Sequence, residues 1–443
     1  MNRRVVITGI GILSPIGIGK DEYWEGLFQG RTGFRKITLF DTSQFKVHIA
    51  GEISDFEPVS FLGKKGLRTL DRSTRLLSSA AKLAIEDAKL HITDETNMSY
   101  SDTKDNGNNP PSPPFSKGGK GGLSGENTHS IGVSIGATFG SLHSISQFDR
   151  EGLIEGPKCV NPSHFPNTVI NSPASQVSIR FNIKGFNTTI STGFCASLDA
   201  VYYAADFIKL NRVDIVLAGG VEELCEETFH GFHNLGCLSG FNGSEPICCP
   251  FDSRRNGTIL SEGAAVLVLE EEEHALKRGA EIPAVILGYA NSFDPEADMG
   301  FNHTGEGLKN AINLALKDAI LSPEDIDYIS SGANSTKGID RMETKVIKDV
   351  FGDYAFKLPV SSIKSMIGES FSASGAFSLA SAVGAINKGL IPPTVNYKEK
   401  DHECDLDYVP NEARQKKINN VLVTSVDPYG NNTAMILGKY NAR

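Results

Sequence analysis

Short apolar runs alternate along the chain with longer segments whose apolar residues recur at helical spacing. Residues 4–11 (RVVITGIG) and 129–137 (HSIGVSIGA) are apolar and rich in glycine, a pattern typical of strands buried on both faces. Between them, residues 71–90 predict a helix with Asp71 or Ser73 as its N-cap. Its apolar residues fall on one helical face: Leu76, Ala80, Leu83, Ala84 and Ala88.

The same alternation continues through the rest of the sequence. We expect strands at residues 213–220 and 264–271, and a helix at residues 307–321. Residues 421–438 (VLVTSVDPYGNNTAMILG) predict two strands around a turn built on Asp427, Pro428 and Gly430. The pattern as a whole indicates an α/β chain with mostly buried sheets.

One segment departs from this pattern. Residues 101–127 are dense in Pro, Gly, Ser and Asn, and Phe115 and Leu123 are their only large apolar residues. Such a segment cannot offset the entropy of ordering by burying apolar surface. We expect a disordered surface insertion before the strand at Ile131, with a recognition role for its proline-rich part as the less favoured alternative.

Composition narrows the class of protein. The 443 residues are 40% hydrophobic, enough for two substantial domains. A net charge of −10 gives no electrostatic footprint for nucleic acid. There is no run of about 18 apolar residues, so we expect no membrane span. The seven cysteines form no C-x-x-C pair, which favours free thiols in a reducing cytoplasm.

The sequence predicts no cofactor and no metal. The early glycines (GIGILSPIG) lack the G-x-G-x-x-G spacing of a dinucleotide site, and there is no phosphate-binding P-loop. No cysteine lies near a zinc-like histidine spacing. One basic cluster could either form a solvated helix face or dock an acidic partner; it comprises Lys64, Lys65, Arg68, Arg72 and Arg75.

Several ordered segments resemble one family over nearly the whole chain. They include RRVVITGIGILSPIG, DIVLAGGVEE, PFDSRRNGTILSEGAAVLVLEEEEHALKRGA, VSSIKSMIGESFSASGAFS and IPPTVNY. These segments are similar to the β-ketoacyl-acyl-carrier-protein synthases, the type II condensing enzymes of fatty-acid and polyketide synthesis.

The resemblance implies a thiolase-like α/β fold. Two similar halves, residues 1–275 and 276–443, would be joined near residues 272–285 and would place their sheets between helix layers (α-β-α-β-α). It also implies a dimer.

The resemblance further implies a cysteine nucleophile at a helix start, two histidines, a lysine and a glutamate. The family's Ser-Thr-x-Cys motif aligns without a gap on residues 190–193 and 198–200, and this places Phe194 at the nucleophile position. Cys195 is one residue further on, which rotates its side chain by roughly 100° around a helix. A phenyl ring has no nucleophilic atom. Cys195 is expected to be a small buried residue, with a displaced nucleophile as the alternative.

The other expected active-site positions have also changed. Matching Ser335-Thr336 and Asp340 places Gly332 at the first histidine position. Lys364-Ser365-Met366-Ile367-Gly368 is intact, but Glu369 stands at the second histidine position, where a carboxylate would repel an enolate. Lys364 and Glu343 are retained, and we expect an ion pair between them. The glycine-rich gate has become Val426-Asp427-Pro428-Tyr429-Gly430.

These losses favour a catalytically inactive partner subunit, similar to the chain-length-factor (ketosynthase β) subunits. Such a chain would form a heterodimer with an active synthase, and Phe194 and Tyr429 would line the acyl tunnel. The basic cluster would dock an acyl carrier protein. Two alternatives stay open: an active 3-oxoacyl synthase that uses Cys195, and a homodimer that binds acyl chains or carrier protein.

Overall fold

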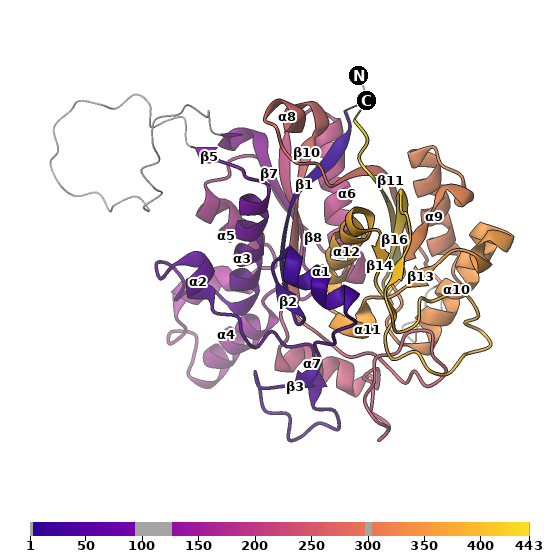
Figure 1. Ribbon diagram of the computed structural model, residues 1–443. Helices are drawn as coiled ribbons and strands as arrows, with labels where there is room; N and C mark the ends of the chain where they lie inside the picture. Colours follow the sequence, from indigo (N-terminus) through magenta and orange to yellow (C-terminus); the bar gives the residue numbers. More distant parts are fainter. Residues whose placement is uncertain (1–2, 94–125, 297–303, 443) are drawn as a thin grey trace.

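The computed structural model describes residues 3–93, 126–296 and 304–442. Helices cover both faces of a large mixed sheet (Figure 1). The expected insertion at 101–127 lies outside the described residues except for Glu126–Asn127, which form the short strand β6 and pair with β5 (Ile92–Thr93).

In the described residues, the amino-terminal half contributes six strands to the main sheet, five in its continuous strand order and β2 (Gly17–Ile18) beside β1. In spatial order the five are β8 (Asn187–Ile190), β7 (Ile131–Gly136), β9 (Ile215–Glu222), β10 (Gly263–Glu271) and β1 (Val5–Ser14). The β7 strand is parallel to β8 and β9, whereas β10 is antiparallel to β9 and β1.

The carboxy-terminal half repeats this arrangement. Its strands, in spatial order, are β13 (Val360–Ser361), β12 (Tyr328–Ser330), β16 (Asn420–Val426), β17 (Asn431–Gly438) and β11 (Ala284–Phe293). The β12 strand is parallel to β13 and β16, whereas β17 is antiparallel to β16 and β11. In both halves the third, second, fourth, fifth and first of these strands along the chain lie side by side in that order. The expectation of two similar halves is confirmed by this shared topology.

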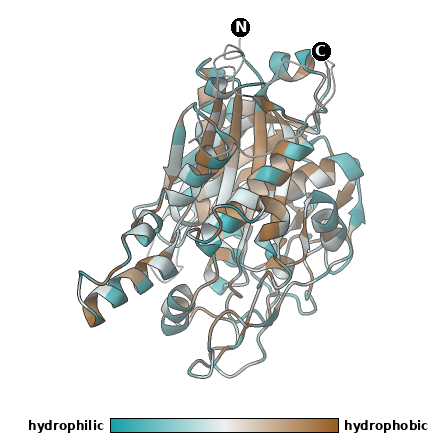
Figure 2. Ribbon diagram, turned by 90° about the vertical axis from the view of Figure 1, so that its left-hand side faces the viewer, coloured by the Kyte–Doolittle hydropathy of each residue, from teal (hydrophilic) through white to brown (hydrophobic). Residues whose placement is uncertain are grey.

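The two halves meet edge to edge. Val5–Ile7 of β1 pairs antiparallel with Ala284–Ile286 of β11, so the strands of both halves form one eleven-stranded sheet that includes β2 (Gly17–Ile18) beside β1. The expected continuously apolar strands are buried along their length: β1, β7, β9 and β10 have buried side chains throughout. Figure 2 shows apolar ribbon concentrated in the central strands and hydrophilic ribbon mainly on the outer helices and loops.

Three helix layers flank the strands. The middle layer consists of α6 (Ala196–Lys209) and α12 (Ser374–Lys388), which pack with strands of both halves in one apolar core. On the outer face of the first half, α3 (Arg72–Asp87) and α5 (Ser172–Phe181) form a second core. On the second half, α9 (Glu306–Ala319) and α10 (Lys337–Phe351) form a third. The five-layer thiolase-like fold is therefore confirmed.

The shorter elements complete these layers. They are α1 (Lys20–Phe28), α2 (Pro58–Leu62), α4 (Leu142–Ile154), α7 (Glu226–Asn234), α8 (Glu272–Lys277), α11 (Lys364–Ile367) and the small strand pairs β3 (Arg35–Lys36) with β4 (Ile49–Ala50) and β14 (Leu390–Ile391) with β15 (Arg414–Gln415). The predicted cap of α3 is confirmed for Asp71, whose carboxylate accepts from the Thr74 N–H at 2.8 Å. Among the described residues, no helix has the length and apolar character to cross a membrane.

Candidate active site

The Ser-Thr-x motif lies where β8 turns into the central helix α6. A single 3-10 turn, Gly193–Cys195, links the strand to the helix. Gly193 has φ +58°, a left-handed conformation that favours glycine and lets the chain reverse sharply here. The turn presents the side chains of Phe194 and Cys195 to different surroundings.

Phe194 lies inside an aromatic cluster. Its side chain is 2% exposed, and its ring centroid is 5.2 Å from that of Phe371 and 6.4 Å from that of Phe232. Phe139 packs edge-on against Phe371 at 5.2 Å. These rings come from four segments that are far apart in the sequence. The residue that the sequence comparison matched to the nucleophile is thus part of a buried aromatic cluster.

Cys195 has different neighbours, which lie at the end of β16 and the start of β17. Its side chain is fully buried, and Sγ contacts the carbonyl oxygens of Ser425 and Asn431 at 3.3 and 3.4 Å. Burial, followed by the nearby carboxylates of Asp199 and Asp427, raises the pKa of the Cys195 thiol well above its usual value. A nucleophilic cysteine needs the opposite environment, one that favours the thiolate.

Glu369 forms a buried ion pair with Lys364. Lys364 Nζ lies 2.8 Å from Glu369 Oε2 and also donates to the carbonyl oxygen of Gly332 at 2.9 Å. Asn334 Nδ2 donates to the same carboxylate oxygen at 3.0 Å. Glu369 Oε1 accepts from the Phe371 N–H at 3.1 Å and from Ser374 Oγ at 2.7 Å. Both oxygens of this carboxylate are therefore engaged by the protein itself.

The expected ion pair between Lys364 and Glu343 is wrong. Glu343 is buried and accepts from Ser331 Oγ at 2.5 Å, from the Gly332 N–H at 3.1 Å and from Thr424 Oγ1. It fixes the backbone at Gly332 from one side while Lys364 binds the Gly332 carbonyl from the other. Gly332, Lys364, Glu369 and Glu343 are thus brought together, but the lysine pairs with Glu369, the residue that the sequence comparison matched to the second histidine.

Tyr429 does not share the buried surroundings of Phe194. It lies in the turn between β16 and β17 and is 53% exposed. The neighbouring Asp427 is fully buried, and its Oδ1 accepts a hydrogen bond from the Phe194 N–H at 3.1 Å. Asp427 therefore links the turn between β16 and β17 to the 3-10 turn before α6.

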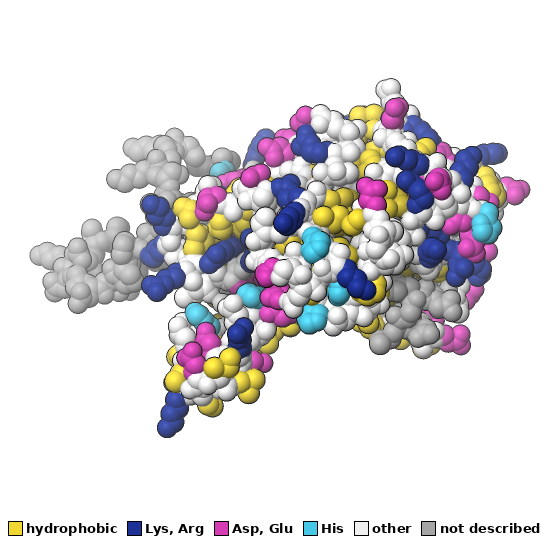
Figure 3. All heavy atoms as spheres, turned by 90° about the horizontal axis from the view of Figure 1, so that it is seen from below, with side chains coloured by type: hydrophobic (Ala, Val, Ile, Leu, Met, Phe, Trp, Pro, Cys, Tyr) yellow, Lys and Arg dark blue, Asp and Glu magenta, His cyan; other side chains and the backbone are white. Residues whose placement is uncertain are grey.

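The residues of the basic cluster differ in their exposure to solvent. Lys64, Lys65 and Arg68 are exposed after α2. Arg72 instead forms an ion pair with the buried Glu262, and Arg75 donates to the Leu67 carbonyl at 3.1 Å. Seen from below, several Lys and Arg side chains lie at the left end of the molecule, the side on which Figure 1 places α2, and others lie across the rest of this face (Figure 3).

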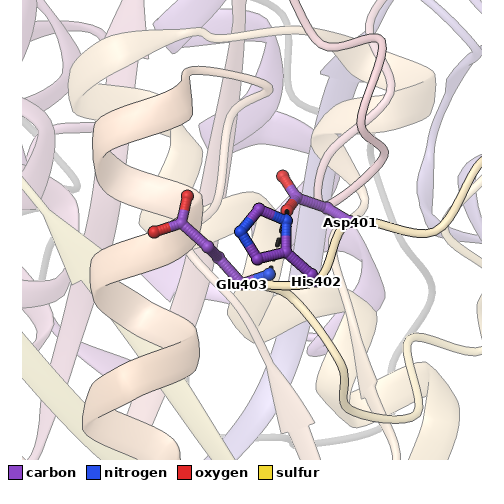
Figure 4. A group of neighbouring side chains, drawn as sticks. All are labelled: Asp401, His402 and Glu403. Carbon is purple, nitrogen blue, oxygen red and sulfur yellow. Dashed lines mark hydrogen bonds and ion pairs between the residues drawn. The ribbon is translucent and has the colours of Figure 1, made fainter.

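One group of side chains in the described part of the chain has the spacing of metal ligands. Asp401, His402 and Glu403 are consecutive residues on a surface loop (Figure 4). Asp401 Oδ2 already pairs with the buried Arg255 at 2.6 Å, and its Oδ1 accepts from the Glu403 N–H at 2.9 Å. His402 is 93% exposed. These contacts make the loop a surface turn tethered to Arg255.

Two residues near the site were not anticipated from sequence. Asp427 was placed in a turn and in the changed gate but given no contact, and Asn334 was not singled out. In the structure Asp427 accepts from the Phe194 N–H, and Asn334 donates to the Glu369 carboxylate. An acidic residue within a glycine-rich gate was the one available signal for Asp427. Nothing in the sequence around Asn334 indicated that its side chain would reach Glu369.

Comparison with known proteins identifies the family of the chain. Residues 2–104 and 119–275 match the model of the beta-ketoacyl synthase N-terminal domain, and residues 283–398 match its C-terminal domain. The chain is 36% identical over 439 residues to the 3-oxoacyl-[acyl-carrier-protein] synthase 2 of Coxiella burnetii (strain RSA 493 / Nine Mile phase I), covering 99% of each chain.

Solved structures give the same result. The ishigamide ketosynthase/chain length factor superposes with a TM-score of 0.85 at 33% identity, over 100% of both chains. A complex of a type II PKS acyl-carrier protein with its ketosynthase bound to the hexaketide matches with a TM-score of 0.83 at 28% identity, also over 100% of both chains. This chain belongs to the β-ketoacyl synthase family of fatty-acid and polyketide synthesis.

Proposed function

We propose that this chain is a catalytically inactive member of the family that pairs with an active synthase and helps to shape its acyl tunnel. The observation that carries the proposal is Phe194. Its ring stands at the nucleophile position, has no nucleophilic atom and packs against Phe232 and Phe371. A condensing enzyme needs a thiolate there to accept the acyl group.

The histidine positions support the same conclusion. Gly332 has no side chain with which to donate a proton or a hydrogen bond. The Glu369 carboxylate is saturated by Lys364, Asn334, Ser374 and the Phe371 N–H. A buried carboxylate held in this way supplies acceptors, whereas an enolate or oxyanion requires donors.

The edge of the main sheet at β8 supports the proposal that the chain binds a second subunit. Strand β8 ends the strand order beyond β7, and α5 and α6 flank it on either side. Ile179 on α5 is 71% exposed and Tyr203 on α6 is 38% exposed, and on α4 Leu153 is 86% exposed. An edge strand beside exposed apolar side chains is a suitable surface for a second sheet. The structural similarity to a ketosynthase/chain length factor favours a synthase as that partner.

Acyl carrier protein is the second proposed partner. The similar ketosynthase complex with its acyl-carrier protein supports this assignment. Lys64, Lys65 and Arg68 are exposed and offer positive charge for an acidic surface. Arg72 and Arg75 hold internal groups, so we assign the contact to the three exposed residues.

An active 3-oxoacyl synthase is the second candidate function. Relatives with that name favour it, as does the presence of Cys195 next to the nucleophile position. Its sulfur, however, contacts Ser425 and Asn431 on the carboxy-terminal strands. A homodimer that binds acyl chains is the remaining alternative, and it predicts self-association without preference for a synthase.

Reconstitution separates these functions. The chain is purified alone and together with an intact synthase, and condensation of an acyl and a malonyl group on carrier protein is followed by mass spectrometry. We expect a complex that forms product and in which Cys195→Ala has no effect. Product formation by the isolated chain, lost on Cys195→Ala, would establish the active alternative. Failure to bind the synthase, with a stable homodimer, would establish the binding protein.

A further inference from the structure

A backbone amide in the 3-10 turn that leads into the central helix already binds a carboxylate. The Phe194 N–H donates to Asp427 Oδ1 at 3.1 Å. Backbone N–H groups at a helix start are favourable donors for negative charge. We propose that Asp427 is an internal occupant of this anion-binding position and closes the chain's own site to a thioester carbonyl, independently of the Phe194 ring. This inference rests on the proposed function, because it describes how an inactive subunit is kept closed.

The turn is shaped to admit this carboxylate. A Cβ atom added to Gly193 would lie 1.9 Å from Asp427 Oδ1, far inside van der Waals contact. Gly193 also has a positive φ of +58°. Glycine therefore leaves the space that the carboxylate fills, and any other residue would displace it.

The Asp427 side chain is held in place by its own turn. Oδ2 accepts from the Tyr429 N–H at 2.9 Å and from Asn431 Nδ2 at 3.3 Å, and the side chain is 0% exposed. Its backbone N–H donates to the Asn431 carbonyl at 2.9 Å. Pro428 follows directly and has no backbone N–H. The turn thus places a hydrogen-bond acceptor, Asp427 Oδ1, against the Phe194 N–H.

The hydrogen bond between the Phe194 N–H and Asp427 would hinder acyl transfer at residue 194. When a thiolate attacks a thioester, a carbon–sulfur bond forms and the carbonyl oxygen becomes an oxyanion before the leaving thiolate departs. That oxygen needs N–H donors at about 2.7–3.1 Å. A carboxylate bound to the same N–H removes the donor and adds a repulsive negative charge. A nucleophile restored at residue 194 would therefore remain unreactive while Asp427 is present.

The test restores the nucleophile with and without the carboxylate. In a Cys195→Ala background, three variants are compared: Phe194→Cys, Phe194→Cys with Asp427→Gly, and Phe194→Cys with Asp427→Asn. Each is incubated with hexanoyl-N-acetylcysteamine thioester, and acylation is followed by intact mass. We expect the Asp427→Gly combination to acylate at least roughly tenfold faster than the other two, because one oxyanion donor contributes on the order of 10²–10³ in rate. Asparagine fills the same space and serves as the matched control.

Two results would overturn the proposal: equal acylation of all three variants, or no acylation in any of them. Hydrogen exchange gives an independent reading in the otherwise native chain, where Asp427→Gly should accelerate exchange of the Phe194 amide. Unchanged exchange would also overturn it. Acylation of the native chain on Cys195 would instead defeat the proposed function, and it is detected separately because Cys195 is absent from the three variants.

Discussion

Lys364 and Glu369 form a buried ion pair with an Nζ–Oε2 distance of 2.8 Å, in the place where the family resemblance implies a lysine and a histidine. The lysine side chain is 3% exposed and the glutamate side chain is 0% exposed. The lysine and the glutamate therefore neutralise each other inside the structural core.

Breaking this pair should destabilise the protein. Glu369→Ala leaves Lys364 charged and unpaired in the interior, which typically costs about 3–5 kcal/mol. The double variant Lys364→Met with Glu369→Gln should cost clearly less, because no uncompensated charge remains. Urea unfolding of both variants and the native protein measures the difference. Equal losses in the two variants would contradict a coupled ion pair.

Phe194 should behave as a core residue. Phe194→Ala removes a ring packed against Phe232 and Phe371 and should lower stability by about 3–5 kcal/mol. Phe194→Leu keeps most of the volume and should cost less. Thermal or urea unfolding measures both. A neutral effect of the alanine variant would mean that the aromatic cluster does not close this space.

Stability should fall as the pH rises from about 5 to above 8. Burial raises the pKa of Glu222 to about 7, and burial together with Asp71 raises the pKa of Glu223 to about 8. The unfolded chain loses these protons near pH 4.5, so the folded state binds more protons between those values. The stabilisation is complete below pH 4.5 and is lost as pH rises through the folded-state pKa values.

Glu223→Gln isolates part of this effect. An amide does not ionise, so the variant should gain stability relative to the native protein as pH rises, and its pH dependence should be shallower. Urea midpoints at pH 5.5, 7 and 8.5 provide the comparison. Parallel pH profiles for the two proteins would show that Glu223 is not the group responsible.

The edge of the sheet should carry the partner contact. Ile179→Asp places a charge on an apolar residue beside β8 and should weaken association with a synthase at least tenfold, without lowering the unfolding midpoint. Ile320→Asp is a matched control, since Ile320 is 91% exposed but follows α9 in the opposite half. Gel filtration and titration measure association. Equal effects of the two substitutions would place the contact elsewhere.

The fold was largely predictable because buried strands and amphipathic helices leave periodic patterns. The halves at 1–275 and 276–443 remain an interpretation of chain length and resemblance, although the repeated strand order supports a division between β10 and β11. The substitutions at Phe194, Gly332 and Glu369 could be found from the sequence, because finding them needs only the alignment of the family's motifs with this chain.

The pairing within the site was not predictable to the same degree. Lys364 was assigned to Glu343, but the short helix α11 directs its side chain to Glu369 instead. Asn334 and Asp427 reach the site through loops whose side-chain directions leave no periodic signal. The aromatic cluster joins residues from four distant segments, and only the folded chain brings Phe139, Phe194, Phe232 and Phe371 together.

The central claim is that this chain carries no working nucleophile. The most direct measurement is intact-protein and peptide mass spectrometry of the native chain after incubation with acyl-loaded carrier protein, alone and in complex with an intact synthase. We predict no acyl adduct on this chain in either sample and an adduct on the active cysteine of the synthase in the complex. A stable acyl adduct on Cys195 of the isolated chain would contradict the account.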